Sequence, residues 1–164
     1  DSLSASAAGK PILLIDGTSG SLNQQQKDYL ATLSTSKFYI LGGENAVSSA
    51  MEAQLATFGE TDRIGGATRY ETSVAVAKTF FGTVENAVVA SGKNFPDGLC
   101  GGPLAAAMNA PLILTADGKT DAAAGYMAEN AIASGYVLGG SGALADESVT
   151  DVFALESADD IVLK

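Results

Sequence analysis

The chain of 164 residues contains no histidine and no tryptophan, and its one cysteine is Cys100. A single cysteine cannot form a disulfide within the chain. Zinc sites and histidine-based catalytic triads need imidazole groups or several thiolates, so the composition essentially excludes both. We therefore expect no metal site.

Basic residues are also scarce. Nine Lys and Arg stand against nineteen Asp and Glu, which gives a formal net charge of −10. A field of that sign repels nucleic acids and anionic membranes at long range, so an anionic partner would have to be held by a local basic site. No apolar run approaches the roughly 20 residues needed to span a bilayer. The chain begins at Asp1 without a signal-like segment, which predicts a mature form or a piece of a longer protein.

Short apolar runs and helical stripes alternate along the chain. The composition is 46% apolar with 19 glycines, as in compact α/β proteins. The runs are continuous rather than alternating, which favours mostly parallel sheets with helices on both faces. Residues 1–10 read as part of a helix or a loose arm. We expect strands at 11–15, 38–41, 62–64, 86–90, 111–114, 136–138 and 161–163, and helical stripes within 22–33, 51–58, 70–81, 96–107, 127–132 and 149–153.

The chain contains an internal repeat. Residues 39–43, Tyr-Ile-Leu-Gly-Gly, return 97 residues later as Tyr-Val-Leu-Gly-Gly, and the Pro-Ile-Leu-Leu of 11–14 returns at 111–114. Residues 1–4 align in the same way with residues 97–100. A period near one hundred residues suits a tandem α/β module. We expect a partial first unit at 1–60, a complete second unit at 61–157, and the start of a third at 158–164.

Both arginines of the chain, Arg63 and Arg69, lie in one stretch. A guanidinium presents a planar fork that matches phosphate or carboxylate groups. Each arginine could therefore contact an anionic ligand. Alternatively, each could pair with a buried carboxylate such as Asp97, because an isolated buried charge is costly.

The loop after the predicted strand 86–90 is a second candidate for anion binding. A loop at the carboxyl end of a parallel strand can offer backbone N–H groups to an anion, and α/β sheets tend to place ligands at that edge. We expect structural roles for Tyr70 and Thr72, and a helix-capping role for Asp97 after Pro96. The candidate anion-binding residues are Arg63, Arg69, Ser91, Gly92, Lys93 and Asn94.

Three further segments admit a function other than anion binding. The glycine-rich segments 17–20 and 139–142 follow predicted strands, yet neither fits a dinucleotide fingerprint or a P-loop, so turn chemistry explains them better. A small hydrolase built on Ser91 and Lys93 is an alternative, although no oxyanion partner is evident. Cys100 lies in a run of small residues, where we expect a packed, inert thiol.

Four motifs in order resemble the type 2 cell-wall-binding repeat of Gram-positive surface proteins. The resemblance implies tandem α/β repeat modules with a Toprim-like, Rossmann-like core. It implies anchoring to an anionic cell-wall polymer, with no enzyme activity and no cofactor. The motifs are Arg63-Ile64-x-Gly66-x-x-Arg69-Tyr70-x-Thr72, Ala90-Ser91-Gly92-x-Asn94-Phe95-Pro96-Asp97-x-Leu99, Ala110-Pro111-Leu112-Ile113-Leu114-Thr115 and Val137-Leu138-Gly139-Gly140-x-Gly142-Ala143-Leu144.

The resemblance predicts a non-catalytic module at the extracellular cell wall that anchors a surface protein to an anionic glycopolymer. The chain departs from the family pattern in two places. No Asn-Phe-Pro precedes Asp1, and the last unit lacks the Arg-x-x-Gly pattern. Because the units are partial, a structural alternative stands beside the binding one. In that alternative the module packs against sister repeats or forms a homo-oligomer.

Overall fold

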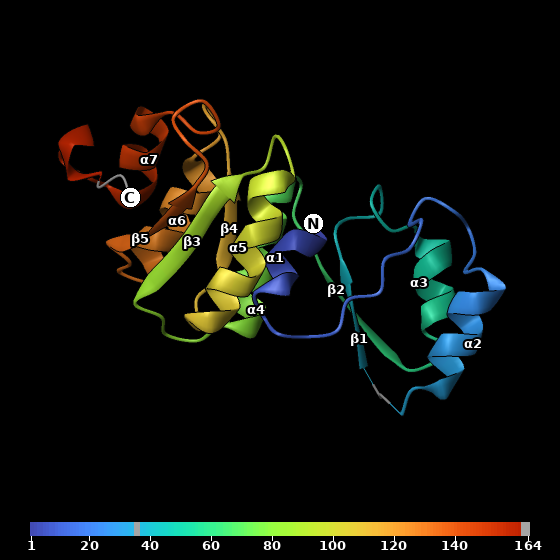
Figure 1. Ribbon diagram of the computed structural model, residues 1–164. Coiled ribbons are helices and arrows are strands. Elements are labelled where there is room, and N and C mark those ends of the chain that lie inside the picture. Colours follow the sequence, from blue (N-terminus) through green and yellow to red (C-terminus); the bar gives the residue numbers. More distant parts are fainter. Residues whose placement is uncertain (35–36, 162–164) are drawn as a thin grey trace.

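The computed structural model describes residues 1–34 and 37–161, and it shows two parallel sheets surrounded by helices (Figure 1). The first sheet pairs β1 (Lys37–Leu41) with β2 (Glu60–Ile64). The second has the strand order β4-β3-β5, with β3 at Asn86–Ser91, β4 at Leu112–Thr115 and β5 at Ser134–Leu138. This confirms the predicted α/β class with mostly parallel sheets.

The central strand β3 explains why the apolar runs are continuous. Ala87 and Val89 point into a cluster with helices α6 (Asp121–Glu129) and α7 (Asp146–Phe153). The alternate residues Val88 and Ala90 point into a cluster on the other face, with α1 (Ser2–Ser6) and α5 (Pro96–Ala107). Both faces of the strand are therefore covered, so neither carries polar residues.

The first sheet is covered in the same manner. On one face Ile40 packs with Leu30 of α2 (Gln24–Thr32) and Met51 of α3 (Ser49–Leu55). On the other face Ile64 packs with Ala5 of α1 and Val76 of α4 (Arg69–Phe80). The helices thus lie on both faces of each sheet.

Helix α4 is shared between the two sheets. Its Val76 belongs to the cluster of the first sheet, and the next residue, Ala77, to a cluster of the second. The Ser73 hydroxyl accepts a hydrogen bond from the backbone N–H of Leu114 at 3.0 Å. That bond gives a partner to an amide on the outer edge of β4. Helix α4 therefore packs on the first sheet and also satisfies the edge of the second.

Helix α1 packs closely on the small-residue helix α5. A Cβ atom built on Gly98 would lie 2.9 Å from Leu3, and one on Gly102 would lie 1.8 Å from the Ser6 hydroxyl. Gly98 and Gly102 therefore provide the space that α1 occupies, whereas Gly101 lies against Leu112 and Leu138 of the second sheet. The glycines of α5 thus allow close packing on both of these neighbours.

Several expected details were wrong. Asp97 does not cap α5, because Phe95 is the N-cap and Asp97 lies in the first turn, against the backbone of Gly139. Helix α6 ends before Ala131, whose left-handed φ of 53° turns the chain back. Cys100 is exposed rather than packed, because α1 contacts a different face of α5.

The run 11–15 forms no strand, although its sequence resembles that of β4. A lone strand has no backbone partners, and no described segment pairs with this run. Of the last expected strand, 162–163 lies outside the described residues, and Ala158–Asp160 forms a short 3₁₀ helix, η1. Asn23 caps α2 through a capping box with Gln26.

The elements recur at the spacing of the sequence repeat. Helices α6 and α7 and strand β5 begin 97 residues after α2, α3 and β1, respectively. The contacts recur as well, since the Asp1 carboxylate lies against Gly42 as that of Asp97 lies against Gly139. The exact division of the chain into units stays a prediction.

Candidate functional site

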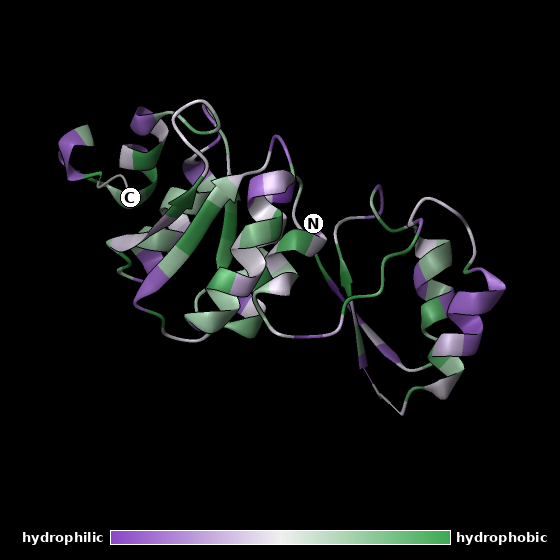
Figure 2. Ribbon diagram, viewed as in Figure 1, coloured by the Kyte–Doolittle hydropathy of each residue, from purple (hydrophilic) through white to green (hydrophobic). Residues whose placement is uncertain are grey.

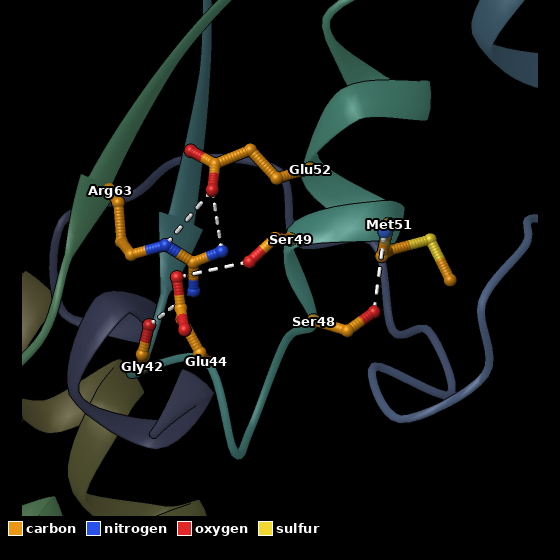
Figure 3. A network of polar contacts seen from close by, with 7 residues as sticks. All are labelled: Gly42, Glu44, Ser48, Ser49, Met51, Glu52 and Arg63. Carbon is orange, nitrogen blue, oxygen red and sulfur yellow. Dashed lines mark hydrogen bonds and ion pairs between the residues drawn. The ribbon is translucent and has the colours of Figure 1, made fainter.

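Arg63 lies on β2, and all three nitrogens of its guanidinium donate hydrogen bonds (Figure 3). Its Nε and Nη2 donate to the Oε2 atom of Glu52 at 3.2 and 2.7 Å, and its Nη1 donates to the Gly42 carbonyl at 2.8 Å. The side chain is 20% exposed. The guanidinium thus joins β2 to α3 and to the turn after β1, as in the pairing alternative, with Glu52 as its partner instead of Asp97.

The other residues of this network hold α3 in place. The Ser49 hydroxyl donates to Glu44 at 3.0 Å, and the Ser48 hydroxyl accepts the N–H of Met51 at 3.3 Å as the helix cap. Helix α3 therefore presents Glu52 to Arg63 from a fixed position. A ligand-binding role for Arg63 stays a prediction.

Arg69 is placed differently. It is the first residue of α4, it is exposed, and its Nη1 donates to the Gly92 carbonyl at 2.8 Å. The Tyr70 ring packs directly against Gly92, since a Cβ atom built on Gly92 would lie 2.6 Å from the ring. Within the described ranges, no carboxylate forms an ion pair with Arg69. The structure therefore brings Arg69, Tyr70 and Gly92 together around a guanidinium with free donors.

A cavity of about 360 Å³ adjoins Arg69. Its walls come from the ends of β1 and β2, from the start of α4 and from Asp1 at the start of α1, and they include Gly43, Asn45, Gly66 and Thr68. Glycine walls let a ligand approach the backbone closely. The position matches the general rule that ligands bind at the carboxyl ends of parallel strands.

The amides at the start of α4 are satisfied within the chain. The N–H groups of Ala67 and Thr68 donate to the Glu71 carboxylate, and that of Gly66 donates to the buried Thr72 hydroxyl at 3.0 Å. Thr72 thus binds the backbone at the turn before α4. With these amides occupied, Arg69 is the basic side chain among the residues that line the cavity.

The predicted loop 91–94 offers less than the sequence suggested. Ser91 is 2% exposed, and the Gly92 amide donates to the Thr115 carbonyl at 2.7 Å. The Lys93 amine pairs with Asp117 at 3.2 Å, while Asn94 is exposed. Of the predicted residues, Arg69 and Gly92 therefore meet directly, whereas Arg63 and Lys93 are engaged with carboxylates.

Sequence reasoning missed Asp117. Its Oδ1 accepts the Ala145 amide and the Ser148 hydroxyl, each at 2.9 Å, at the start of α7. The Ala145 amide, then Ser148 and Lys93, hold the pKa of Asp117 below its usual value. The available signal was Ala145 itself, because alanine at an N-cap supplies no acceptor and another side chain must do so.

The geometry gives the hydrolase alternative no support. Ser91 is buried and its hydroxyl accepts the Lys93 amide at 3.4 Å, while the Lys93 amine is drawn to Asp117. Among the residues that the structure describes, no group of three or more metal-ligating side chains could hold an ion. None of the described helices is long and apolar enough to cross a membrane.

The chain resembles proteins of known name over most of its length. It is 33% identical to the amidase enhancer of Bacillus subtilis over 60% of the chain and 14% of that protein. It is 31% identical to the N-acetylmuramoyl-L-alanine amidase LytC of B. subtilis over 89% of the chain and 30% of that enzyme. It therefore spans less than a third of either relative.

Two solved structures share the fold. Cwp6 from Clostridium difficile superimposes with a TM-score of 0.74 at 26% identity, over 94% of this chain and 26% of the other. Cwp8 from the same organism gives 0.75 and 26%, over 93% of this chain and 27% of the other.

The family model of cell wall binding domain 2 matches residues 1–52 and 63–149. The match covers the segments that carry Arg63, Arg69 and the loop after β3. It confirms the resemblance seen in the motifs and the expected location at the extracellular cell wall. The chain belongs to the cell wall binding domain 2 family.

Proposed function

We propose that this chain is a non-catalytic module that holds a surface protein at the cell wall by binding an anionic glycopolymer beside Arg69. The observation that carries the proposal is the exposed guanidinium at the 360 Å³ cavity, whose Nη1 is fixed by the Gly92 carbonyl. Its remaining N–H groups can donate to a phosphate or carboxylate, and the fork geometry favours such groups.

The overall negative charge of the chain restricts polymer binding to a local basic site. With a net charge of −10, the surface as a whole repels a polyanion. Of the three basic residues predicted to bind the anion, Arg63 is paired with Glu52 and Lys93 with Asp117, so Arg69 is the one that the described contacts leave for a ligand. Ser91, Gly92 and Asn94 then support the site as its neighbouring loop.

The test is retention of the purified chain on purified walls, with and without their anionic polymer. Arg69→Gln removes the cation, and Lys119→Gln is the matched control, because Lys119 is exposed and lies outside the cavity. A charge-assisted hydrogen bond contributes about 1.5–3 kcal/mol, so Arg69→Gln should weaken retention by roughly 10- to 100-fold. Lys119→Gln should leave it nearly unchanged.

The salt dependence and a conservative variant of Arg69 provide two further checks. Retention should fall as ionic strength rises, because contacts between exposed charges are screened. Arg69→Lys should restore part of the retention, since it keeps the charge but not the fork. Equal binding to stripped walls, or equal loss in both glutamine variants, would show that the polymer is held elsewhere or is not the ligand.

A further inference from the structure

Lys93 is a second basic residue at the edge of the sheet where Arg69 binds the Gly92 carbonyl. It follows Gly92 directly, and its amine contacts the Oδ2 atom of Asp117, in the loop after β4, at 3.2 Å. Figure 2 shows β3 as mostly hydrophobic and the loop after it as hydrophilic. Two cationic side chains therefore meet one short polar loop, Arg69 through the Gly92 carbonyl and Lys93 as the next residue.

The ion pair between Lys93 and Asp117 is exposed to solvent. The two side chains are 52% and 43% exposed, and exposed pairs of this kind stabilise a protein little. Arg63 differs, because its guanidinium is 20% exposed and binds both Glu52 and the Gly42 carbonyl. Of these two ion pairs, the one at Lys93 is therefore the one that an incoming anion can replace.

Asp117 keeps other partners when the lysine leaves. Its Oδ1 accepts the Ala145 amide and the Ser148 hydroxyl, each at 2.9 Å, whereas Lys93 contacts Oδ2. The side chain is partly exposed, so water can solvate Oδ2 in place of the amine. The exchange therefore leaves no buried charge without a partner, which is the situation that makes the loss of an ion pair costly.

The backbone of the loop is held by contacts that do not use the Lys93 amine. The Gly92 N–H donates to the Thr115 carbonyl at 2.7 Å, at the end of β4. The Lys93 N–H donates to the hydroxyl of the buried Ser91 at 3.4 Å. The Lys93 side chain can therefore turn toward a ligand while the loop stays in place and the Gly92 carbonyl continues to bind Arg69.

We propose that Lys93 is a second anion contact of the polymer site, which Asp117 holds until a ligand with a second anionic group replaces that carboxylate. This inference rests on the proposed function, and it narrows the ligand to a chain with a phosphate or carboxylate on neighbouring units. A single anion occupies Arg69 alone. A longer chain gains Lys93 as well, and linking the two contacts raises its affinity because the second contact forms within the complex.

The test compares glycerol 3-phosphate, which carries one anionic group, with a synthetic glycerol phosphate trimer. Each is titrated into the folded chain while the amide NMR signals of Gly92 and its neighbours are followed. Lys93→Gln should weaken binding of the trimer by about 3- to 10-fold and leave glycerol 3-phosphate unchanged. Lys78→Gln is the matched control, because Lys78 is also 52% exposed and pairs with a carboxylate, that of Glu129, between α4 and α6. A galacturonate trimer is titrated in the same way, and the trimer whose binding depends on Lys93 identifies the anion as phosphate or carboxylate.

Asp117→Asn should have the opposite effect on binding. Removing the carboxylate frees the lysine, so this variant should bind the trimer about two- to fivefold more tightly, although we expect its Tm to fall. In a Lys93→Gln background, the same change should leave binding unaltered. This double-mutant cycle separates release of the lysine from the general loss of a negative charge, because the latter would act in both backgrounds.

The second contact is refuted if Lys93→Gln weakens both probes equally, if Lys78→Gln weakens the trimer as much, or if the gain from Asp117→Asn persists without Lys93. Arg69→Gln tells this inference apart from the proposed function. If Arg69→Gln weakens both probes while Lys93→Gln weakens neither, the site beside Arg69 stands and the second contact is absent. If Arg69→Gln leaves both probes bound, that site is wrong and the present inference fails with it.

Discussion

The contact between α1 and α5 yields a prediction that can be worked out in detail. A Cβ on Gly102 would lie 1.8 Å from the Ser6 hydroxyl and 2.7 Å from the Ser6 Cβ, far inside contact distance. Gly102→Ala must therefore push the two helices apart. Overpacking of this kind destabilises by about 1–3 kcal/mol. In a chain of this size that corresponds to a loss of roughly 2–12 °C in Tm.

The clash can be isolated with a double-mutant cycle. Ser6→Gly removes both clashing atoms, at the expense of the Ser6 hydrogen bond to the Leu3 carbonyl, 2.5 Å long. Combined with Gly102→Ala, it should recover about 1–2 kcal/mol relative to the sum of the single changes. Any effect of Pro103, which follows Gly102, is present with and without Ser6→Gly and therefore cancels in the coupling energy of the cycle.

The assay is urea unfolding followed by circular dichroism. Gly125→Ala is the matched control, because Gly125 lies in α6 with nothing within 4 Å of a built Cβ. There, the higher helix propensity of alanine should raise the free energy of unfolding by up to about 1 kcal/mol. If Gly102→Ala proves neutral, or if Ser6→Gly recovers nothing, the helices are not in contact as described.

Three further predictions concern polar and ionisable groups. Glu52→Gln should lower the free energy of unfolding by about 1–3 kcal/mol in urea titrations, because Arg63 loses its carboxylate partner, yet should leave wall retention of the folded chain unchanged. Asp117→Asn should lower Tm at neutral pH. Because the pKa of Asp117 is depressed in the folded state, its carboxylate stabilises the fold above its usual pKa and this stabilisation is lost in acid. The difference in Tm between wild type and variant should therefore shrink below about pH 4. Burial raises the pKa of Tyr126, so wild type should lose stability as the pH rises above about 10, and Tyr126→Phe should lose less in the same titration.

Much of the fold was predictable because local sequence and final environment agree. The run Ala87-Val88-Val89-Ala90 predicts a strand buried on both faces, and the structure covers it on both. Asn23 has a capping residue's chemistry and caps α2. Such features are determined by residues that are close in the sequence, so the sequence alone predicts them.

Features that depend on distant neighbours were not predictable. Residues 11–15 resemble residues 111–115 closely, yet they form no strand, because a strand exists through its partners. The partner of Arg63 is Glu52, eleven residues away on another element, and no spacing rule selects it over Asp97. The role of Asp117 likewise appears once the loops after β4 and β5 are placed together.

The position of α4 has a consequence for the coupling between the two sheets. Its consecutive residues Val76 and Ala77 are each 1% exposed and pack in clusters of different sheets. Side-chain packing on a common helix, rather than a flexible tether, therefore holds the two sheets together. Removing either sheet would expose a buried face of α4, so we expect the two sheets to unfold as one cooperative unit.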